Sequence, residues 1–168
     1  MTREPCFACG AMAPSDDGPS HAYMLSSPGC WALYGEVLTR EYSDPALFAS
    51  SHRLTVDAYA AQHPGDLSQQ RSRQSMWLHL TALYAVLELD WSHDAAMRLL
   101  KTLTGRALPE PTVTPGVFDV NVERVAAANR AEHHHTVERW ARTTLSAWQR
   151  CDRGVTPFLD TLIAAATP

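Results

Sequence analysis

The sequence predicts an all-α protein, a bundle of about five to six helices behind a loop-rich N-terminal cap. Apolar residues recur at three- and four-residue spacing from Cys30 almost to the end of the chain, which is typical of helices with one buried face. No strand-like alternation of apolar and polar residues is present. Residues 1–29 hold three Gly, four Pro and two of the four Cys instead, a composition that indicates turns.

The first two helices are predicted to be antiparallel neighbours. One is expected over residues 30–42 and ends at the Ser-Asp-Pro sequence that follows. Asp44 is a suitable N-cap and Pro45 a suitable first residue for the second helix, which should end near His63. Because the link between them is so short, the chain must reverse direction there.

The rest of the chain continues the helical pattern after one loop. Further helices are expected over residues 67–89, from the cap Ser92 to Gly105, over 131–150 and over 156–166, and residues 120–128 can form a short additional one. Residues 106–118 contain three Pro and are predicted to form a crossing loop. A single domain over 1–168 is expected, with a cap at 1–29, an antiparallel helical core at 30–104 and C-terminal helices at 119–168.

Charge and hydropathy exclude several classes of partner. The chain has 14 Lys and Arg against 18 Asp and Glu, with a pI near 6.0, whereas nucleic-acid binding needs a basic surface. No apolar run approaches the roughly 20 residues that span a bilayer. The N-terminal residues include no apolar stretch of signal-peptide length, so the expected location is the cytoplasm.

The strongest chemical signal is the pair Cys6 and Cys9 in Cys-Phe-Ala-Cys-Gly. Two intervening residues allow both sulfurs to face one ion, and the following Gly permits the tight turn, as in zinc knuckles. Two other interpretations are open. A redox pair is one, although that motif normally follows a strand and opens a helix. Incidental thiols in a frayed tail are the other.

The remaining zinc ligands must come from other parts of the chain. Cys30 opens the first predicted helix, where the helix dipole favours a thiolate, whereas Cys151 is expected to be a small buried apolar residue. Antiparallel counting puts His63 about one turn beyond the level of Cys30, and His21 in the cap is the alternative fourth ligand. The prediction is a structural zinc ion, bound by three Cys and one His, that fastens the cap to the helices.

A second polar cluster is predicted inside the bundle. His52 and His79 lie at similar separations from the turn between their helices, and Glu41 falls within the apolar stripe of the first helix. Glu36 is expected to lie closer to the level of His52 along the helix axis, but it points away from that stripe. Two imidazoles and a carboxylate can hold a second metal with open positions or transfer protons. The structural alternative is that they only satisfy one another or the backbone.

Two further features have ordinary explanations at this stage. The run Glu132-His133-His134-His135 looks like a metal-binding tract, but three consecutive helical residues point in three directions, so at least one faces water. Solvated His at a helix start is the preferred interpretation. Arg53 and Asp57 are four residues apart and are expected to form an ion pair on the outer side of the second helix.

Several motifs together resemble a bacterial family of uncharacterised proteins classed as a domain of unknown function. They are CFACG at 6–10, DGPSHAY at 17–23, SPGCWALYGE at 27–36, HRLTVDAYAAQHPG at 52–65, QSMWLHL at 74–80 and EHHHTVERWARTTLSAW at 132–148. Phe7 stands where Pro is usual in the family's knuckle. The resemblance implies no activity, but it gives emphasis to Cys6, Cys9, His21, Cys30, His52, His63 and His79.

Three functions fit these residues, and the sequence alone does not decide whether the protein is an enzyme. The first is a zinc-stabilised helical module that binds a protein or small-molecule partner. The second is a metal-dependent hydrolase or lyase that uses His52, His79 and Glu41. The third is a redox or metal sensor in which oxidation of Cys6 and Cys9 releases zinc.

Overall fold

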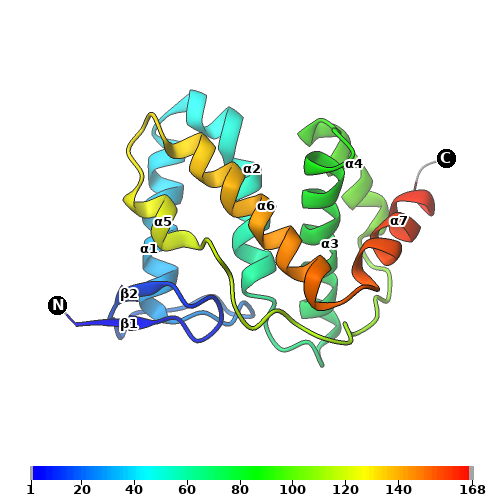
Figure 1. The fold of residues 1–168 in the computed structure, drawn as a ribbon, viewed down its shortest axis with the longest axis horizontal. Helices are drawn as coiled ribbons and strands as arrows, with labels where there is room; N and C mark the ends of the chain where they lie inside the picture. The colour runs from blue at the N-terminus through cyan, green and yellow to red at the C-terminus, as the bar shows by residue number, and fades with distance from the viewer. Residues whose placement is uncertain (1, 167–168) are drawn as a thin grey trace.

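The computed structural model describes residues 2–166 and confirms the predicted all-α class. Within this range the helices are α1 (Pro28–Tyr42), α2 (Pro45–Gln62), α3 (Gln70–Leu87), α4 (His93–Leu103), α5 (Val122–Ala127), α6 (His133–Cys151) and α7 (Val155–Ala164). α2 packs against α1, α3 and α6, and α3 also contacts α4 and α7 (Figure 1). α2 and α3 therefore form the centre of the bundle.

The cap contains a short hairpin, so the expectation that the chain lacks strands was wrong here. β1 (Arg3–Pro5) and β2 (Met12–Pro14) pair antiparallel and lie at the lower end of α1 (Figure 1). Strands of three residues that each end in Pro are too short to show alternation. Gly29 allows the hairpin to approach α1, because a Cβ there would lie 1.9 Å from the carbonyl oxygen of Pro14.

The helix caps explain where the chain turns. Both Asp44 and Ser92 cap as predicted, since the Asp44 carboxylate accepts from the backbone N–H groups at the start of α2 and Ser92 Oγ accepts from the N–H of Ala95. α3 begins at Gln70 rather than near residue 67. The Asp66 carboxylate accepts from the N–H of Ser68, 3.0 Å away, and this local turn delays the helix.

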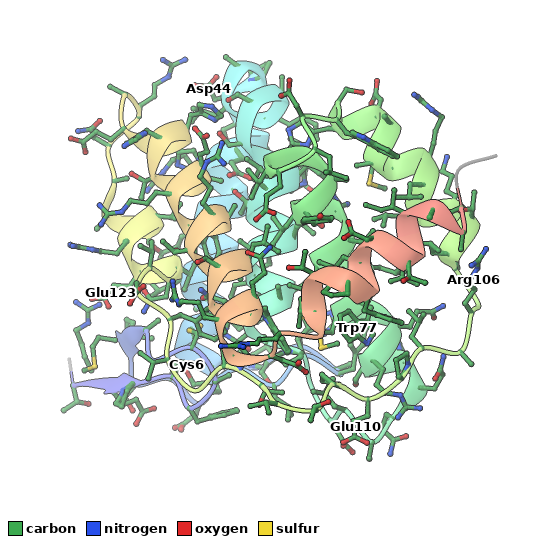
Figure 2. All side chains as sticks on the ribbon, turned by 45° about the vertical axis from the view of Figure 1, so that its right-hand side comes forward. Cys6, Asp44, Trp77, Arg106, Glu110 and Glu123 are labelled. Carbon is green, nitrogen blue, oxygen red and sulfur yellow. The ribbon has the colours of Figure 1, made fainter. Side chains whose placement is uncertain are left out.

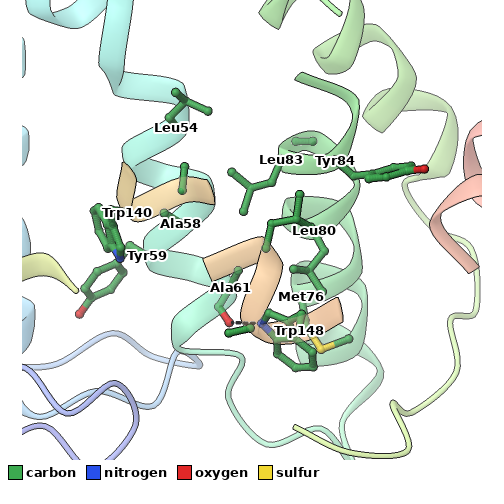
Figure 3. Packing of buried hydrophobic residues seen from close by; sticks show 14 of the residues in the cluster. Leu54, Ala58, Tyr59, Ala61, Met76, Leu80, Leu83, Tyr84, Trp140 and Trp148 are labelled. Atoms are coloured by element: carbon green, nitrogen blue, oxygen red, sulfur yellow. Dashed lines mark hydrogen bonds between the residues drawn. The ribbon is translucent and has the colours of Figure 1, made fainter. Parts of the chain in front are cut away.

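The hydrophobic core lies between α2, α3 and α6 (Figure 3). Leu80 and Leu83 of α3 are fully buried, as are Trp140 and Trp148 of α6. The indole Nε1 of Trp148 donates a hydrogen bond of 2.9 Å to the carbonyl oxygen of Ala61. This bond fixes α6 against the last turn of α2, which is the turn that leads into His63.

The predicted crossing loop has no helix or strand between residues 106 and 118. It runs along the lower side of the molecule from α4 towards α5 (Figure 1). Side chains of α3 hold its first part, since Trp77 Nε1 donates to the carbonyl of Pro109 at 2.8 Å and Arg73 Nε to that of Leu108 at 3.0 Å. Among the helices of residues 2–166, none combines the length and the hydropathy of a membrane-spanning segment.

Candidate metal centre

Four side chains from three separate segments meet in one buried cluster. Cys6 and Cys9 lie in the turn between β1 and β2, and Cys30 lies in the first turn of α1. His63 is the C-cap residue of α2. Their sulfur and nitrogen atoms all lie within 4.8 Å of one another. The four residues are 0–3% exposed. Figure 2 shows Cys6 at the lower end of the bundle beside the hairpin.

The hairpin turn is shaped so that Cys6 and Cys9 face the same point. The N–H of Cys6 donates to the carbonyl of Ala11, and the N–H of Gly10 donates to the carbonyl of Cys6, both at 2.8 Å. Gly10 has φ +74°, in the left-handed region that residues with a side chain rarely adopt. The glycine after the second Cys is therefore needed for this turn, as the sequence pattern predicted.

The residue before α1 directs a backbone N–H to one of the thiols. Ser27 Oγ caps the helix by accepting from the N–H of Cys30 at 3.3 Å. The N–H of Ser27 itself points to Cys6 Sγ at 3.5 Å. Backbone donors and the positive end of the helix dipole both favour thiolates at this position.

The orientation of His63 is fixed by its own helix. Its Nδ1 lies 2.7 Å from the carbonyl oxygen of Tyr59, which can only accept, so the proton is on Nδ1. In this tautomer Nε2 is the nitrogen available to a metal, and it lies 3.7 Å from Cys6 Sγ and 3.5 Å from Cys30 Sγ. A hydrogen bond from the second ring nitrogen to a backbone carbonyl is the usual arrangement for a metal-binding His.

Three distances between atoms of the cluster fit a tetrahedral metal site. Usual Zn–S and Zn–N bond lengths at the tetrahedral angle give about 3.8 Å between two sulfurs and about 3.6 Å between sulfur and nitrogen. Cys9 Sγ and Cys30 Sγ are 3.8 Å apart, and the two sulfur–nitrogen distances bracket the second value. A disulfide would require about 2.0 Å, and the thiols are free. The cluster can therefore hold a metal ion.

Three thiols this close together cannot all ionise without a cation. Hydrogen bonds from Cys30 and then Cys9 hold the pKa of Cys6 far below its usual value. The Cys30 contact lowers the pKa of Cys9, but Cys6 and burial outweigh it and raise that pKa to about 12. Contact with Cys6, then with Cys9, raises the pKa of Cys30. A bound cation would stabilise the thiolate form of all three cysteines.

The alternative ligand His21 lies outside the cluster. Its Nδ1 accepts from the N–H groups of Tyr23 and Met24 at 3.3 and 3.2 Å, and its ring packs against Trp31. Cys151 is also separate, half-buried with its thiol 3.3 Å from the carbonyl of Trp148.

The structure does not bring His52 and His79 into one site. Nδ1 of His52 contacts Glu41 at 2.9 Å, as expected, but Nδ1 of His79 contacts Asp57 at 2.7 Å. Residues 52 and 57 are five positions apart on α2, which turns their side chains about 140° away from each other. Within residues 2–166, the three Cys and His63 make up the group of His, Cys, Asp or Glu found at metal-binding spacing.

Two side chains were missed or misplaced by the sequence analysis. His133 is fully buried, while His134 and His135 are exposed, so the run is not solvated as a whole. The helical spacing of His133 to Val137 and Trp140 was the available signal. Arg53 does pair with Asp57, but the carboxylate is 1% exposed and not on the outer side of α2.

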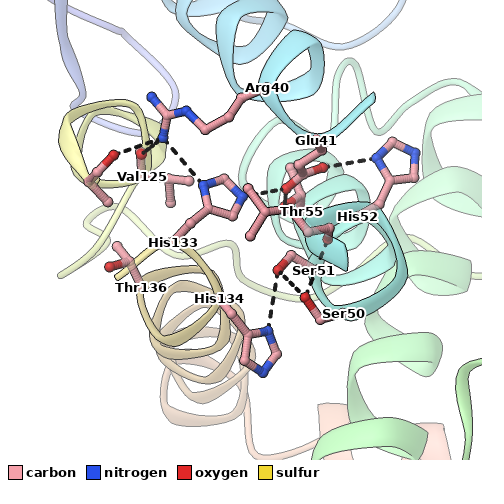
Figure 4. A network of polar contacts seen from close by, with 12 residues as sticks. Arg40, Glu41, Ser50, Ser51, His52, Thr55, Val125, His133, His134 and Thr136 are labelled. Carbon is pink, nitrogen blue, oxygen red and sulfur yellow. Dashed lines mark hydrogen bonds and ion pairs between the residues drawn. The ribbon is translucent and has the colours of Figure 1, made fainter. Parts of the chain in front are cut away.

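The buried histidine completes a polar network around Glu41 (Figure 4). Oε1 of Glu41 accepts from Thr55 Oγ1 at 2.5 Å and lies 2.9 Å from His133 Nε2. Arg40 contacts His133 Nδ1 at 3.3 Å and donates to three carbonyl oxygens at the end of α5, at 2.8–3.1 Å. Each of these polar side chains has a partner within the chain. The network therefore has a structural role, which is to connect α1, α2, α5 and α6.

Fold and site together define a class, an all-α protein with an N-terminal hairpin and a buried group of three Cys and one His that can hold a metal ion. Residues 4–149 match the family described as "family of unknown function (DUF5946)", and the chain belongs to this family. The matched range includes all four residues of the cluster. No solved structure matches the chain.

Proposed function

We propose that this chain is a zinc-binding helical protein whose zinc is structural, and that its work is to bind a partner. The proposal rests on one observation, the buried cluster of Cys6, Cys9, Cys30 and His63 at tetrahedral spacing. Three thiolates and an imidazole are ligands that zinc prefers in proteins. Free thiols fit a reducing compartment such as the cytoplasm.

A structural role fits the cluster better than a catalytic one. Catalytic zinc keeps an open position for water or substrate, whereas four protein donors complete the tetrahedral shell. The donors are also almost fully buried, so water has little access to them. When bound, the ion neutralises the thiolates and contributes its binding free energy to folding.

The hairpin buries little apolar surface against the helices. The apolar side chains that the hairpin buries are small, namely Ala11 and Ala13, in addition to the two cysteines. Small side chains remove little apolar surface from water, at about 25 cal/mol per Å². A metal bound by both the hairpin turn and the ends of α1 and α2 would therefore provide much of the stability of the cap.

The enzyme alternative depends on a metal shared by His52 and His79. Each of these side chains contacts a different carboxylate, Glu41 or Asp57. Each carboxylate also has a further donor, Thr55 or Arg53, so the two pairs are satisfied without an ion. This geometry favours the binding module over the enzyme.

Nuclear magnetic resonance of the zinc-loaded and chelator-treated protein tests the structural role. On removal of zinc, we expect the amide signals of residues 2–29 to lose dispersion, while those of α3, α4 and α7, which do not contribute ligands, keep most of theirs. An unchanged spectrum after complete loss of metal would contradict the proposal. The Cys30→Ser variant should give the chelated spectrum without chelator, and Cys151→Ser should give the spectrum of the parent.

A further inference from the structure

A cavity of about 440 Å³ opens at the lower end of the bundle, next to the metal centre. Its wall combines the hairpin turn, the link between α2 and α3, the crossing loop and the end of α6. The residues that line it include Phe7, Leu25, Gln62, Asp66, Phe118 and Trp148. The volume lies in the range of small-molecule sites, which is about 300–1,000 Å³.

Gln62, which lines the cavity, has an unpartnered hydrogen-bond acceptor in its side chain. Its Nε2 donates to the carbonyl of Val120 at 2.8 Å and to Thr144 Oγ1 at 2.9 Å. The Val120 carbonyl can only accept, and the Thr144 hydroxyl already donates to the carbonyl of Trp140, so the amide cannot be flipped. Oε1 of Gln62 has no donor among the described residues, although the side chain is 1% exposed.

An unpaired buried acceptor is unfavourable, so a donor from outside the chain is its natural partner. The charge of the cavity points to the same kind of ligand. Asp66 is the charged residue of the lining, and Lys, Arg and His are absent from it. Hydrogen bonds from the Ser68 hydroxyl and N–H keep the pKa of Asp66 below its usual value, so it is anionic at neutral pH. An anionic ligand would therefore be repelled.

The rest of the wall is apolar and partly open to solvent. Phe7 is 71% exposed and Leu25 is 50% exposed, which is high for large apolar side chains. The inner wall is formed by Phe118 and Trp148, which are buried. A ligand with an aromatic or aliphatic body would cover the exposed side chains and contact the buried ones.

We propose that this cavity binds a small molecule with an apolar body and an amine or amide N–H, which donates to Oε1 of Gln62 and, when cationic, lies near Asp66. The inference deepens the proposed function by naming the class of partner. It rests on that function in one respect, because Phe7 stands between the two cysteines of the turn and the metal would fix its position.

Tryptamine is a suitable probe, with indole-3-propionate as a probe of similar size and opposite charge. Titration of the zinc-loaded protein, followed by amide chemical shifts, should place tryptamine in the cavity with a Kd of about 1 mM or below. Indole-3-propionate should bind at least about tenfold more weakly. Equal affinities, shifts away from the cavity, or no binding of tryptamine would overturn the inference.

Variants separate the two polar contacts. Asp66→Asn should weaken the affinity for tryptamine about three- to tenfold. Asp17→Asn, at an exposed position, changes the net charge equally and should leave this affinity unchanged. Gln62→Leu should weaken it as well, but this change also removes two buried hydrogen bonds. Thr114→Trp avoids that problem, since it fills the cavity from an exposed position and should abolish binding without unfolding the chain.

Zinc content measured in each sample keeps the two proposals distinct. Full zinc occupancy without tryptamine binding contradicts the ligand assignment and leaves the structural zinc unaffected. Tryptamine binding by a folded chain that takes up no zinc contradicts the proposed function and supports the cavity alone.

Discussion

Nε2 of His133 donates a hydrogen bond of 2.9 Å to Oε1 of Glu41, and both side chains are fully buried. Nδ1 of the same ring faces a guanidinium nitrogen of Arg40 at 3.3 Å, which can only donate. Nδ1 is therefore the acceptor of this contact, and Nε2 is the ring atom that donates to Glu41. This contact links residues 92 positions apart and fixes the start of α6 against the end of α1.

The first prediction concerns the stability that this network provides. Glu41→Ala should lower the free energy of unfolding by about 3–5 kcal/mol, because it leaves buried donors without their shared acceptor. Glu36→Ala on the exposed side of α1 is the matched control and should change it by less than about 0.5 kcal/mol. Urea denaturation measures both values. Equal effects would show that the buried network contributes nothing specific.

The second prediction tests whether His79 is a metal ligand. His79→Phe removes one donor from the buried Asp57 carboxylate, but Arg53 still contacts both carboxylate oxygens. We expect a loss of about 1–3 kcal/mol in stability and no change in metal content. Elemental analysis beside urea denaturation checks both parts. Loss of a bound ion from this variant would restore the enzyme interpretation.

The third prediction is a pH dependence in the cap. Burial, and secondarily the nearby Arg71, lowers the pKa of His21 below its usual 6.5, so the folded state binds fewer protons than the unfolded state. The stabilising contribution is complete above about pH 6.5 and is lost as the pH falls through the folded pKa. The Nδ1 atom that accepts from Tyr23 and Met24 would then carry a proton.

Unfolding free energies between pH 5 and 8 check this prediction. His21→Gln removes the titrating group, so its stability relative to the parent should change with pH, with the parent losing more on acidification. A constant difference between the two proteins across this range would contradict the assignment.

The sequence predicted the helices and the four clustered residues because both depend on local spacing. Apolar periodicity and the caps Asp44 and Ser92 set the helix ends, and CxxCG set the turn that holds Cys6 and Cys9. Choosing His63 needed only the antiparallel packing of two adjacent helices. His133 was missed because the apolar stripe of Val137 and Trp140 was not followed back one turn to the start of the helix. The contact between the buried Asp57 and His79 was not predicted either, because it depends on how α2 is rotated relative to α3.

The fourth prediction compares two cysteines. Cys9→Ser should lower the Tm by about 5–10 °C, the change expected when about 3 kcal/mol is lost from a chain of this size. Cys151→Ser should leave the Tm within about 1–2 °C of the parent, because that thiol lies outside the cluster. Thermal denaturation followed by circular dichroism measures both. A Cys9→Ser protein that melts like the parent and keeps its metal would show that the site is wrong.

Metal content per chain is the most direct test of the account. Elemental analysis of untagged protein, purified without chelator, should give one zinc per chain in the parent and none in the Cys30→Ser variant. Protein that folds with no metal, or a Cys30→Ser variant that retains a full equivalent of zinc, would contradict the assignment of Cys6, Cys9, Cys30 and His63 as a zinc site.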